Sequence, residues 1–161
     1  MTTLPWKTRI ITTKKGKKRR LTNPYWKHVK KTDTQFSLLV RLLAADENGI
    51  VECFTCGKKD RWQHGHMECG HYKPRGNMNT RWDIINNNVQ CAHPNQDNCN
   101  RDKGGNIKVY RQNLIMLYGV KEVENLESRS AILKIWTIDE MRELRKEFAK
   151  QVKLIRKEKG L

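Results

Sequence analysis

The spacing of the cysteines constrains this chain more than any other feature of its sequence. Cys53 and Cys56 are separated by two residues and followed at once by Gly57, a spacing that lets both thiolates reach one zinc ion. A tetrahedral site needs two more ligands, and Cys91 and Cys99 are the candidates further along the chain. The interval between the two pairs leaves room for a hairpin, as in a treble clef. We therefore predict a structural Zn²⁺ ion held by these four cysteines.

A competing interpretation is that these cysteines are small buried apolar residues. The surrounding segment argues against it, because residues 50–106 are polar and hold all five cysteines and four of the five histidines. The N-terminus lacks the apolar core of a signal peptide, so we expect a protein that is not exported. In a reducing compartment, paired cysteines favour a metal over disulfides. Cys69 is the unpaired fifth cysteine, and we leave it outside the zinc site.

The chain carries a large excess of positive charge. Its 161 residues include 33 Lys and Arg against 17 Asp and Glu, a net charge of +16. The length suits one domain, and the basic excess points to a polyanion, most commonly nucleic acid. No apolar run approaches the roughly 20 residues that span a bilayer, so no membrane partner is expected. The densest basic run lies in an N-terminal arm, where the expected DNA contacts are Lys14, Lys15, Lys17, Lys18, Arg19 and Arg20.

Hydrophobic periodicity predicts helices on both sides of a metal-organised centre. A first helix is expected over residues 34–45, with Asp33 or Thr34 as its N-cap, and short strands and loops over 50–106. A helix over 107–117 should end near Gly119, followed by a short helical turn over 120–126. A capping box that begins at Thr137 predicts a last helix that runs to about Lys157. We therefore expect a basic arm (1–33), a zinc-bound core with its leading helix (34–118) and a C-terminal helical segment (119–161).

Aromatic residues in the arm and an apolar stripe in the last helix each have two interpretations. Trp6, Tyr25 and Trp26 would either stack on bases or sugars or, more commonly, dock the arm on the core. The stripe has nearly heptad spacing, so it would either join two chains or pack on its own core, as any amphipathic helix does. It consists of Met141, Leu144, Phe148, Val152 and Ile155.

Between the two cysteine pairs lies an ordered set of residues suited to phosphodiester hydrolysis. His71 ends a predicted short strand, Asn86 lies in the loop that follows, and Asn100 stands directly after a predicted zinc ligand. This order resembles the ββα-metal arrangement of His-Asn-His nucleases. The resemblance implies an α+β, zinc-braced treble-clef core with flanking helices.

More narrowly, the chain resembles the phage NinG (Rap) recombination-protein family. The similarity lies in Gly-His-Tyr at 70–72, Arg-Trp-Asp at 81–83, Asn-x-x-x-Gln-Cys at 86–91 and Cys-Asn-x-x-Lys-x-Gly-Asn at 99–106, and it covers roughly residues 36–150. This family is known for structure-specific cleavage of branched DNA, including Holliday junctions. The Cys-Asn step beside a four-cysteine site is also similar to phage endonuclease VII. Both have a tight Cys-x-x-Cys as the second pair, whereas residues 92–98 intervene here.

The chemistry of phosphodiester hydrolysis suggests a role for each residue of this ordered set. The reaction needs a base to deprotonate water and a cation to neutralise the transition state. His71 suits the base. Asn100 offers a carbonyl oxygen to Mg²⁺ or Mn²⁺, although it would also serve as an N-cap. Glu68 or Asp102 would supply the metal-binding carboxylate, unless Asp102 is a surface residue of the first helical turn.

Other residues would support this set. Asn86 or Asn88 would hold the loop next to His71 through hydrogen bonds. Cations around the site suit phosphate contact, although each is equally an ordinary solvated charge; they are Lys73, Arg75, Arg81 and Lys103.

The resulting hypothesis is a metal-dependent endonuclease for branched DNA, acting on Holliday junctions in phage recombination or replication. Two nicks in symmetry-related strands require two catalytic sets, so a homodimer is expected. The family resemblance implies the cytoplasm of an infected bacterial host. The alternatives are a His-Asn-His nicking or sequence-specific endonuclease on duplex DNA and a zinc module that binds nucleic acid without catalysis.

Overall fold

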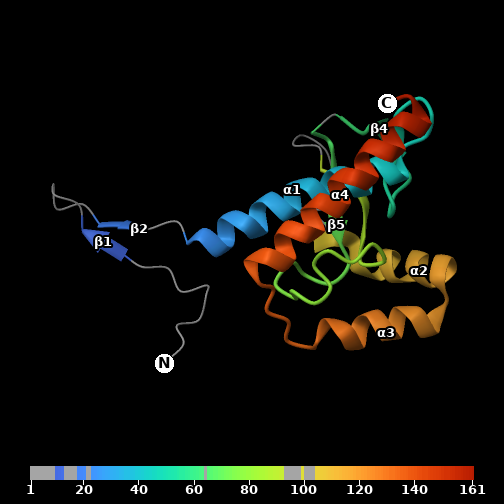
Figure 1. Cartoon of the computed structure of the whole chain (residues 1–161). Coiled ribbons are helices and arrows are strands. Elements are labelled where there is room, and N and C mark those ends of the chain that lie inside the picture. Colours follow the sequence, from blue (N-terminus) through green and yellow to red (C-terminus); the bar gives the residue numbers. More distant parts are fainter. Residues whose placement is uncertain (1–9, 13–17, 21–22, 64, 93–98, 100–103) are drawn as a thin grey trace.

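Helices and short antiparallel sheets make up the protein, so the predicted α+β class is confirmed at that level (Figure 1). The computed structural model describes residues 10–12, 18–20, 23–63, 65–92, 99 and 104–161. Among them are four α-helices and three two-stranded sheets. The elements are β1 (Ile10–Thr12), β2 (Lys18–Arg20), α1 (Pro24–Ala44), β3 (Ile50–Glu52), β4 (Lys59–Arg61), β5 (Met67–His71), β6 (Asn87–Cys91), the 3-10 turn η1 (Gly104–Asn106), α2 (Ile107–Tyr118), α3 (Val120–Ser130) and α4 (Ile138–Lys159).

Helix α1 begins ten residues before the predicted start at residue 34, so that prediction was wrong. Asn23 is the N-cap, because its side chain accepts a hydrogen bond from the Tyr25 amide at 2.9 Å, and proline follows at the first helical position. The apolar face of the helix extends back through Val29 to Tyr25, with lysines between. The last ten residues of the predicted arm therefore form the first half of a packed helix. Tyr25 docks on the core, as expected, whereas Trp26 is exposed.

Helix α4 lies alongside α1, and the two run parallel (Figure 1). The predicted capping box is present, because Thr137 and Glu140 exchange side-chain-to-backbone hydrogen bonds of 3.1 and 2.6 Å. The apolar stripe of α4 packs inward, and the Phe148 ring lies 5.1 Å from that of Phe36, centroid to centroid. The stripe therefore belongs to the chain's own core, and the hypothesis that it joins two chains loses its basis.

Two hairpins stand beside α1 and meet at the cysteines. Strands β5 and β6 pair antiparallel. His71 lies opposite Asn87 at the end of the hairpin where the loop between the two strands begins. Strands β3 and β4 pair likewise, and the turn that carries the first cysteine pair follows β3. The Phe54 amide donates to the Val89 carbonyl at 2.8 Å and so joins the two hairpins. This bond places the first cysteine pair next to the end of β6.

Helices α2 and α3 enclose a second, smaller apolar cluster. Tyr110 and Leu114 of α2 are fully buried against Val123 and Leu126 of α3, and Tyr72 joins them from the end of β5. Helix α2 ends at Gly119 as predicted, and its residue range matches the expected one within a residue. Helix α3 is longer than the predicted short turn. In the part of the chain that the structure describes, no helix is long and apolar enough to cross a membrane.

The end of α4 caps the end of α1. The Lys159 ammonium donates to the carbonyls of Leu42 and Leu43, each at 3.0 Å, and to that of Ala45. These carbonyls lack helical partners and carry the negative end of the helix dipole. The contact therefore ties the two parallel helices together at one end.

We expect Lys159→Met to lower the free energy of unfolding by about 1–2 kcal/mol, because charged hydrogen bonds to the end of α1 are lost. Lys157→Met is the matched control, since Lys157 is exposed on the same turn of α4. Urea denaturation of both variants measures the difference. Equal stability of the two variants would contradict the capping role.

Candidate metal centre and active site

The four predicted zinc ligands converge on one point. The sulfur atoms of Cys53, Cys56, Cys91 and Cys99 all lie within 4.8 Å of one another. Sulfurs at about 2.3 Å from a tetrahedral zinc lie about 3.8 Å apart, and the Cys56 and Cys91 sulfurs are separated by 3.6 Å. The sulfur positions therefore confirm the predicted pairing of Cys91 with Cys99, although residues 92–98 separate the two cysteines. The cluster fits a structural zinc ion.

Neighbouring donors complete the cluster. The Cys99 amide donates to the Cys91 sulfur at 3.4 Å, and the Thr55 hydroxyl lies 3.5 Å from the Cys53 sulfur. Burial first, and then the neighbouring sulfurs, raise the pKa of the Cys56 thiol to about 12. Four adjacent thiolates are stable only around a cation, so the donor set itself calls for a metal.

Cys69 lies outside the cluster, as expected. Its thiol is buried and donates to the side-chain oxygen of Asn87 at 3.5 Å. Burial raises the pKa of this thiol to about 12, so it stays protonated. Cys69 is therefore a packed residue of β5 and not a metal ligand.

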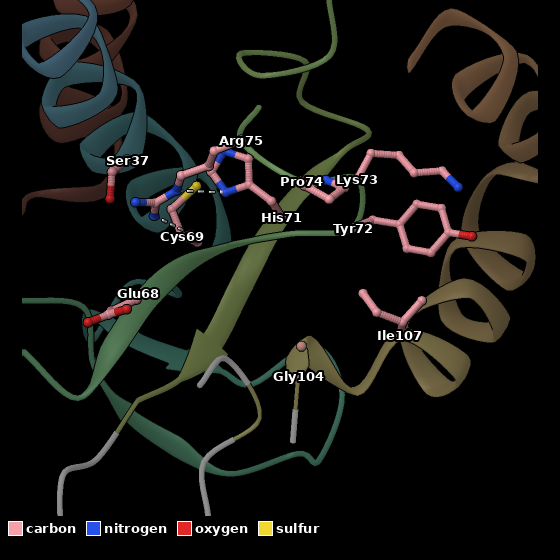
Figure 2. Close-up of a pocket in the computed structure, with 11 residues that line it drawn as sticks. Ser37, Glu68, Cys69, His71, Tyr72, Lys73, Pro74, Arg75, Gly104 and Ile107 are labelled. Carbon is pink, nitrogen blue, oxygen red and sulfur yellow. Dashed lines mark hydrogen bonds between the residues drawn. The ribbon is translucent and has the colours of Figure 1, made fainter. Parts of the chain in front are cut away.

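His71 ends β5 and lines an open pocket of about 840 Å³ (Figure 2). The walls come from α1, from β5 with the loop after it, and from the turn that precedes α2. The lining residues are Ser37, Glu68, Cys69, His71, Tyr72, Lys73, Pro74, Arg75, Gly104, Gly105 and Ile107. Three elements distant in sequence thus enclose the histidine predicted as the base.

The pocket keeps His71 uncharged. Burial lowers the pKa of His71 to about 4, and the positive charges of Arg75 and Arg81 act in the same direction. The Arg75 Nε–H group donates to Nδ1 of His71 at 3.4 Å, the contact drawn in Figure 2. A neutral imidazole retains a lone pair, here on Nδ1, and the low pKa means that this nitrogen takes up a proton only weakly while Arg75 lies beside it.

Asn86 is completely buried and holds the loop that begins after His71. Its side-chain oxygen accepts from the Lys73 amide at 2.7 Å, and its nitrogen donates to the carbonyls of Lys73 and Thr80 at 3.1 and 3.0 Å. The Tyr72 amide also donates to the Asn86 carbonyl at 2.9 Å. Of the two asparagines considered for this position, Asn86 therefore makes the loop contacts.

The predicted metal-binding residues are only partly described. Glu68 is half-buried on β5 and lines the same pocket as His71, although the two project from opposite faces of the strand. Asn100, Asp102 and Lys103 lie outside the described residues, as do Lys14, Lys15 and Lys17 of the arm. Helix α2 begins only at Ile107, after η1. The other three predicted DNA contacts of the arm, Lys18, Arg19 and Arg20, form strand β2.

The three described cations near the pocket differ in their partners. Arg81 is largely buried and binds Asp33 of α1 through two contacts of 2.8 and 2.6 Å, so it is a structural ion pair. Lys73 lies 3.6 Å from the Glu127 carboxylate. Arg75 is exposed, and no ion pair of the described residues involves it. Arg75 is therefore the cation best placed to receive a phosphate.

Gln90 is a supporting residue that the sequence analysis did not identify. It is fully buried, and its side-chain nitrogen donates to the Thr55 hydroxyl at 3.1 Å and to the Gly105 carbonyl at 2.8 Å. It therefore links the zinc cluster to the turn before α2. Its side chain crosses Gly70, where an added Cβ would lie 2.1 Å from the Gln90 oxygen. The available signal was its position directly before the zinc ligand Cys91, in the Asn-x-x-x-Gln-Cys motif.

Glu127 of α3 is the second residue that was missed. It accepts a hydrogen bond from the Tyr72 hydroxyl and binds Arg111 at 3.0 Å and Lys73 at 3.6 Å. Hydrogen bonds from Arg111 and then Tyr72 lower the pKa of Glu127 to about 2. This carboxylate fixes the residues that directly follow His71.

We expect one zinc ion per purified chain. Cys99→Ser should lose the ion and unfold the centre of the chain, because binding of structural zinc supplies about 10 kcal/mol of folding free energy. Cys69→Ser is the matched control and should keep the ion. Elemental analysis and circular dichroism measure both effects, and well-folded protein without zinc would contradict the site.

We expect the Glu127 contacts to stabilise the fold by about 1–2 kcal/mol at pH 7. Because the folded pKa is about 2 and the ordinary value is 4.5, this stabilisation is present above pH 4.5 and is lost as the pH falls toward 2. The stability difference between the parental chain and Glu127→Gln should therefore shrink over that range. Glu124→Gln, exposed on the same helix, should show no such dependence.

Comparison with known proteins places the chain among phage proteins. It is 27% identical to Protein ninG of Escherichia phage lambda over 134 residues, which cover 82% of this chain and 58% of that protein. It is 26% identical to Protein ninG of Salmonella phage P22, again over 82% of this chain and 58% of the relative. The chain thus spans just under three-fifths of the length of these relatives. No solved structure matches it.

The family described as "Bacteriophage Lambda NinG protein" matches residues 7–158. All four cysteines of the cluster, the β5–β6 hairpin and the pocket with His71 lie within this range. On this match, the chain belongs to the NinG family of bacteriophage proteins.

Proposed function

We propose that the chain is a metal-dependent endonuclease that cleaves branched DNA, with the four-way junction as its leading substrate. The observation that carries the proposal is the position of His71. An uncharged histidine ends β5 in an open pocket, on a hairpin whose partner strand supplies a ligand of the four-cysteine cluster. Strand β5, strand β6 and helix α2 follow in this order along the chain, and the order supports a ββα-metal, treble-clef core.

Within this proposal His71 takes the proton from the attacking water. Its Nδ1 atom accepts from Arg75 in the structure, and a phosphate in the pocket would compete for that guanidinium. Movement of Arg75 to the phosphate would leave the lone pair of Nδ1 open to water. Arg75 then binds substrate, and Asn86 and Gln90 hold the pocket walls.

Bound Mg²⁺ or Mn²⁺ would neutralise charge on the phosphate and on the leaving oxygen. Glu68 is the described residue that would hold the ion, and it lies in the pocket wall. Asn100 and Asp102 are proposed as further ligands on the strength of the sequence alone.

Cleavage of both strands of a junction requires a second catalytic set, so we propose that the protein acts as a homodimer. Since the stripe of α4 is used within the chain, another surface must form the interface. The relatives are phage proteins, and the proposed place of action is the cytoplasm of an infected bacterium.

We expect His71→Ala to lower the rate of junction cleavage by about 10²–10⁴-fold, because a general base contributes that much. Junction binding and zinc content should stay at parental levels. Added imidazole should restore part of the rate, since it replaces the missing base. The cleavage rate of a labelled four-way junction with Mg²⁺ is measured for the parental chain and for His71→Ala. Cys69→Ser serves as the buried-residue control.

The same assay separates the alternatives. Cleavage of linear duplex as fast as of the junction would identify a duplex endonuclease. A parental chain that binds DNA but cuts no form of it with Mg²⁺ or Mn²⁺ would identify a zinc module without catalysis. Parental rates in His71→Ala would refute the role of this histidine.

A further inference from the structure

We propose that a cluster of cations on α1 and α4, on the side of α1 turned away from the pocket, binds the phosphate backbone of a second arm of a branched DNA. The choice of branched DNA rests on the proposed function, whereas the cluster itself rests on contacts within the structure. We name it the α1–α4 basic patch. It consists of Lys27, Lys31, Arg142 and Arg145, arranged around His28.

The charges of the patch come from two helices and not from one basic run of the sequence. Arg142 and Arg145 come from α4 and the two lysines from the first half of α1. All four positive charges act on the single ring of His28, whose pKa is lowered first by burial and then by them. The parallel packing of the two helices is what brings these residues together (Figure 1).

Arg145 is held in place without a carboxylate. Its guanidinium donates to the Thr32 hydroxyl at 3.2 Å and to the His28 carbonyl at 3.5 Å, and it lies 3.3 Å from Nδ1 of His28. These neutral partners orient the group but leave its charge uncompensated. A fixed cation of this kind is suited to an incoming phosphate.

The other cations have little compensation either. Lys27 and Lys31 are exposed, and neither takes part in an ion pair of the described residues. Arg142 pairs with Asp139 at 2.6 Å, one turn away on an exposed helix face, where such pairs contribute little. Some other cations of the described residues bind carboxylates within the fold, as Arg81 does with Asp33. Like charges left together in this way favour an external polyanion.

The patch and the pocket lie on different sides of α1. Asp33 faces the pocket side, where it binds Arg81, and Ser37, one helical turn on, lines the pocket itself. Lys31 stands two residues before Asp33, about 200° around the helix. One straight duplex seated in the pocket would therefore run past α1 and not around it to the patch. Two arms that diverge from a branch point can engage both surfaces.

This arrangement gives a measurable preference for branched DNA. A second contact made by a molecule already bound acts at a high effective concentration, so a junction gains affinity from both surfaces. A linear duplex uses one surface at a time and gains little from having two. The patch would thus contribute to shape selectivity without reading any base.

The test is the charge-reversed variant Lys27→Glu/Lys31→Glu. Affinity for a labelled four-way junction should fall at least about tenfold, while affinity for a linear duplex should fall no more than about twofold. Lys150→Glu/Lys153→Glu makes the same change in net charge at exposed positions further along α4 and should leave the ratio of the two affinities at its parental value. Fluorescence anisotropy without added divalent cation measures binding alone, and zinc content checks that each variant is folded.

Three outcomes would overturn the proposal: an equal fall for junction and duplex, no change for either, or the same loss of preference in the control variant. The result does not depend on cleavage. A chain that never cuts DNA but loses its junction preference in Lys27→Glu/Lys31→Glu would refute the proposed function and retain the patch. A chain that cuts junctions yet keeps its preference in the variant would retain the function and refute the patch.

Discussion

The convergence of four sulfur atoms is the constraint on which the rest of the core depends. The first cysteine pair follows β3, Cys91 ends β6, and Cys99 leads toward α2, so one ion would fasten two hairpins and the approach to a helix. Apolar residues of both hairpins also pack into the main core beside α1, among them Val51, Met67 and Val89. The position of His71 at the end of β5 thus depends on this packing and on a metal cluster that it does not touch.

Some basic residues of this protein form ion pairs within the fold, and others stay exposed to solvent. Several cations of a chain with net charge +16 bind carboxylates within the fold, as Arg81 binds Asp33, Arg111 binds Glu127 and Arg129 binds Asp83. The pairs of Arg81 and Arg129 join segments that are distant in sequence, and that of Arg111 joins the consecutive helices α2 and α3. Other cations stay exposed without such a partner among the described residues, including Arg75 at the pocket and the two lysines of the α1–α4 basic patch. Basic residues near a site are thus poor guides to substrate contact until their partners are known.

The sequence predicted the features that depend on local spacing. Cysteine spacing identified the cluster, and the Thr137 capping box placed the start of α4. It failed for the start of α1, because lysines interleaved with buried Tyr25 and Val29 gave the segment the composition of a basic arm. It also failed for Gln90 and Glu127, whose partners come from distant elements. Long-range partners carry no signal in the spacing of a single sequence.

The crossing of Gln90 over Gly70 has a consequence for how this family can vary. A side chain at position 70 would collide with the Gln90 amide, and a shorter residue at position 90 would release the Gly105 carbonyl that it holds. A substitution of Gly70 alone would disturb the hairpin, and a substitution of Gln90 alone would disturb the turn before α2. The dependence runs in one direction, because a side chain at position 70 is tolerated only on a background where position 90 already carries a smaller residue. Relatives with a residue larger than glycine at position 70 should therefore lack a long side chain at position 90.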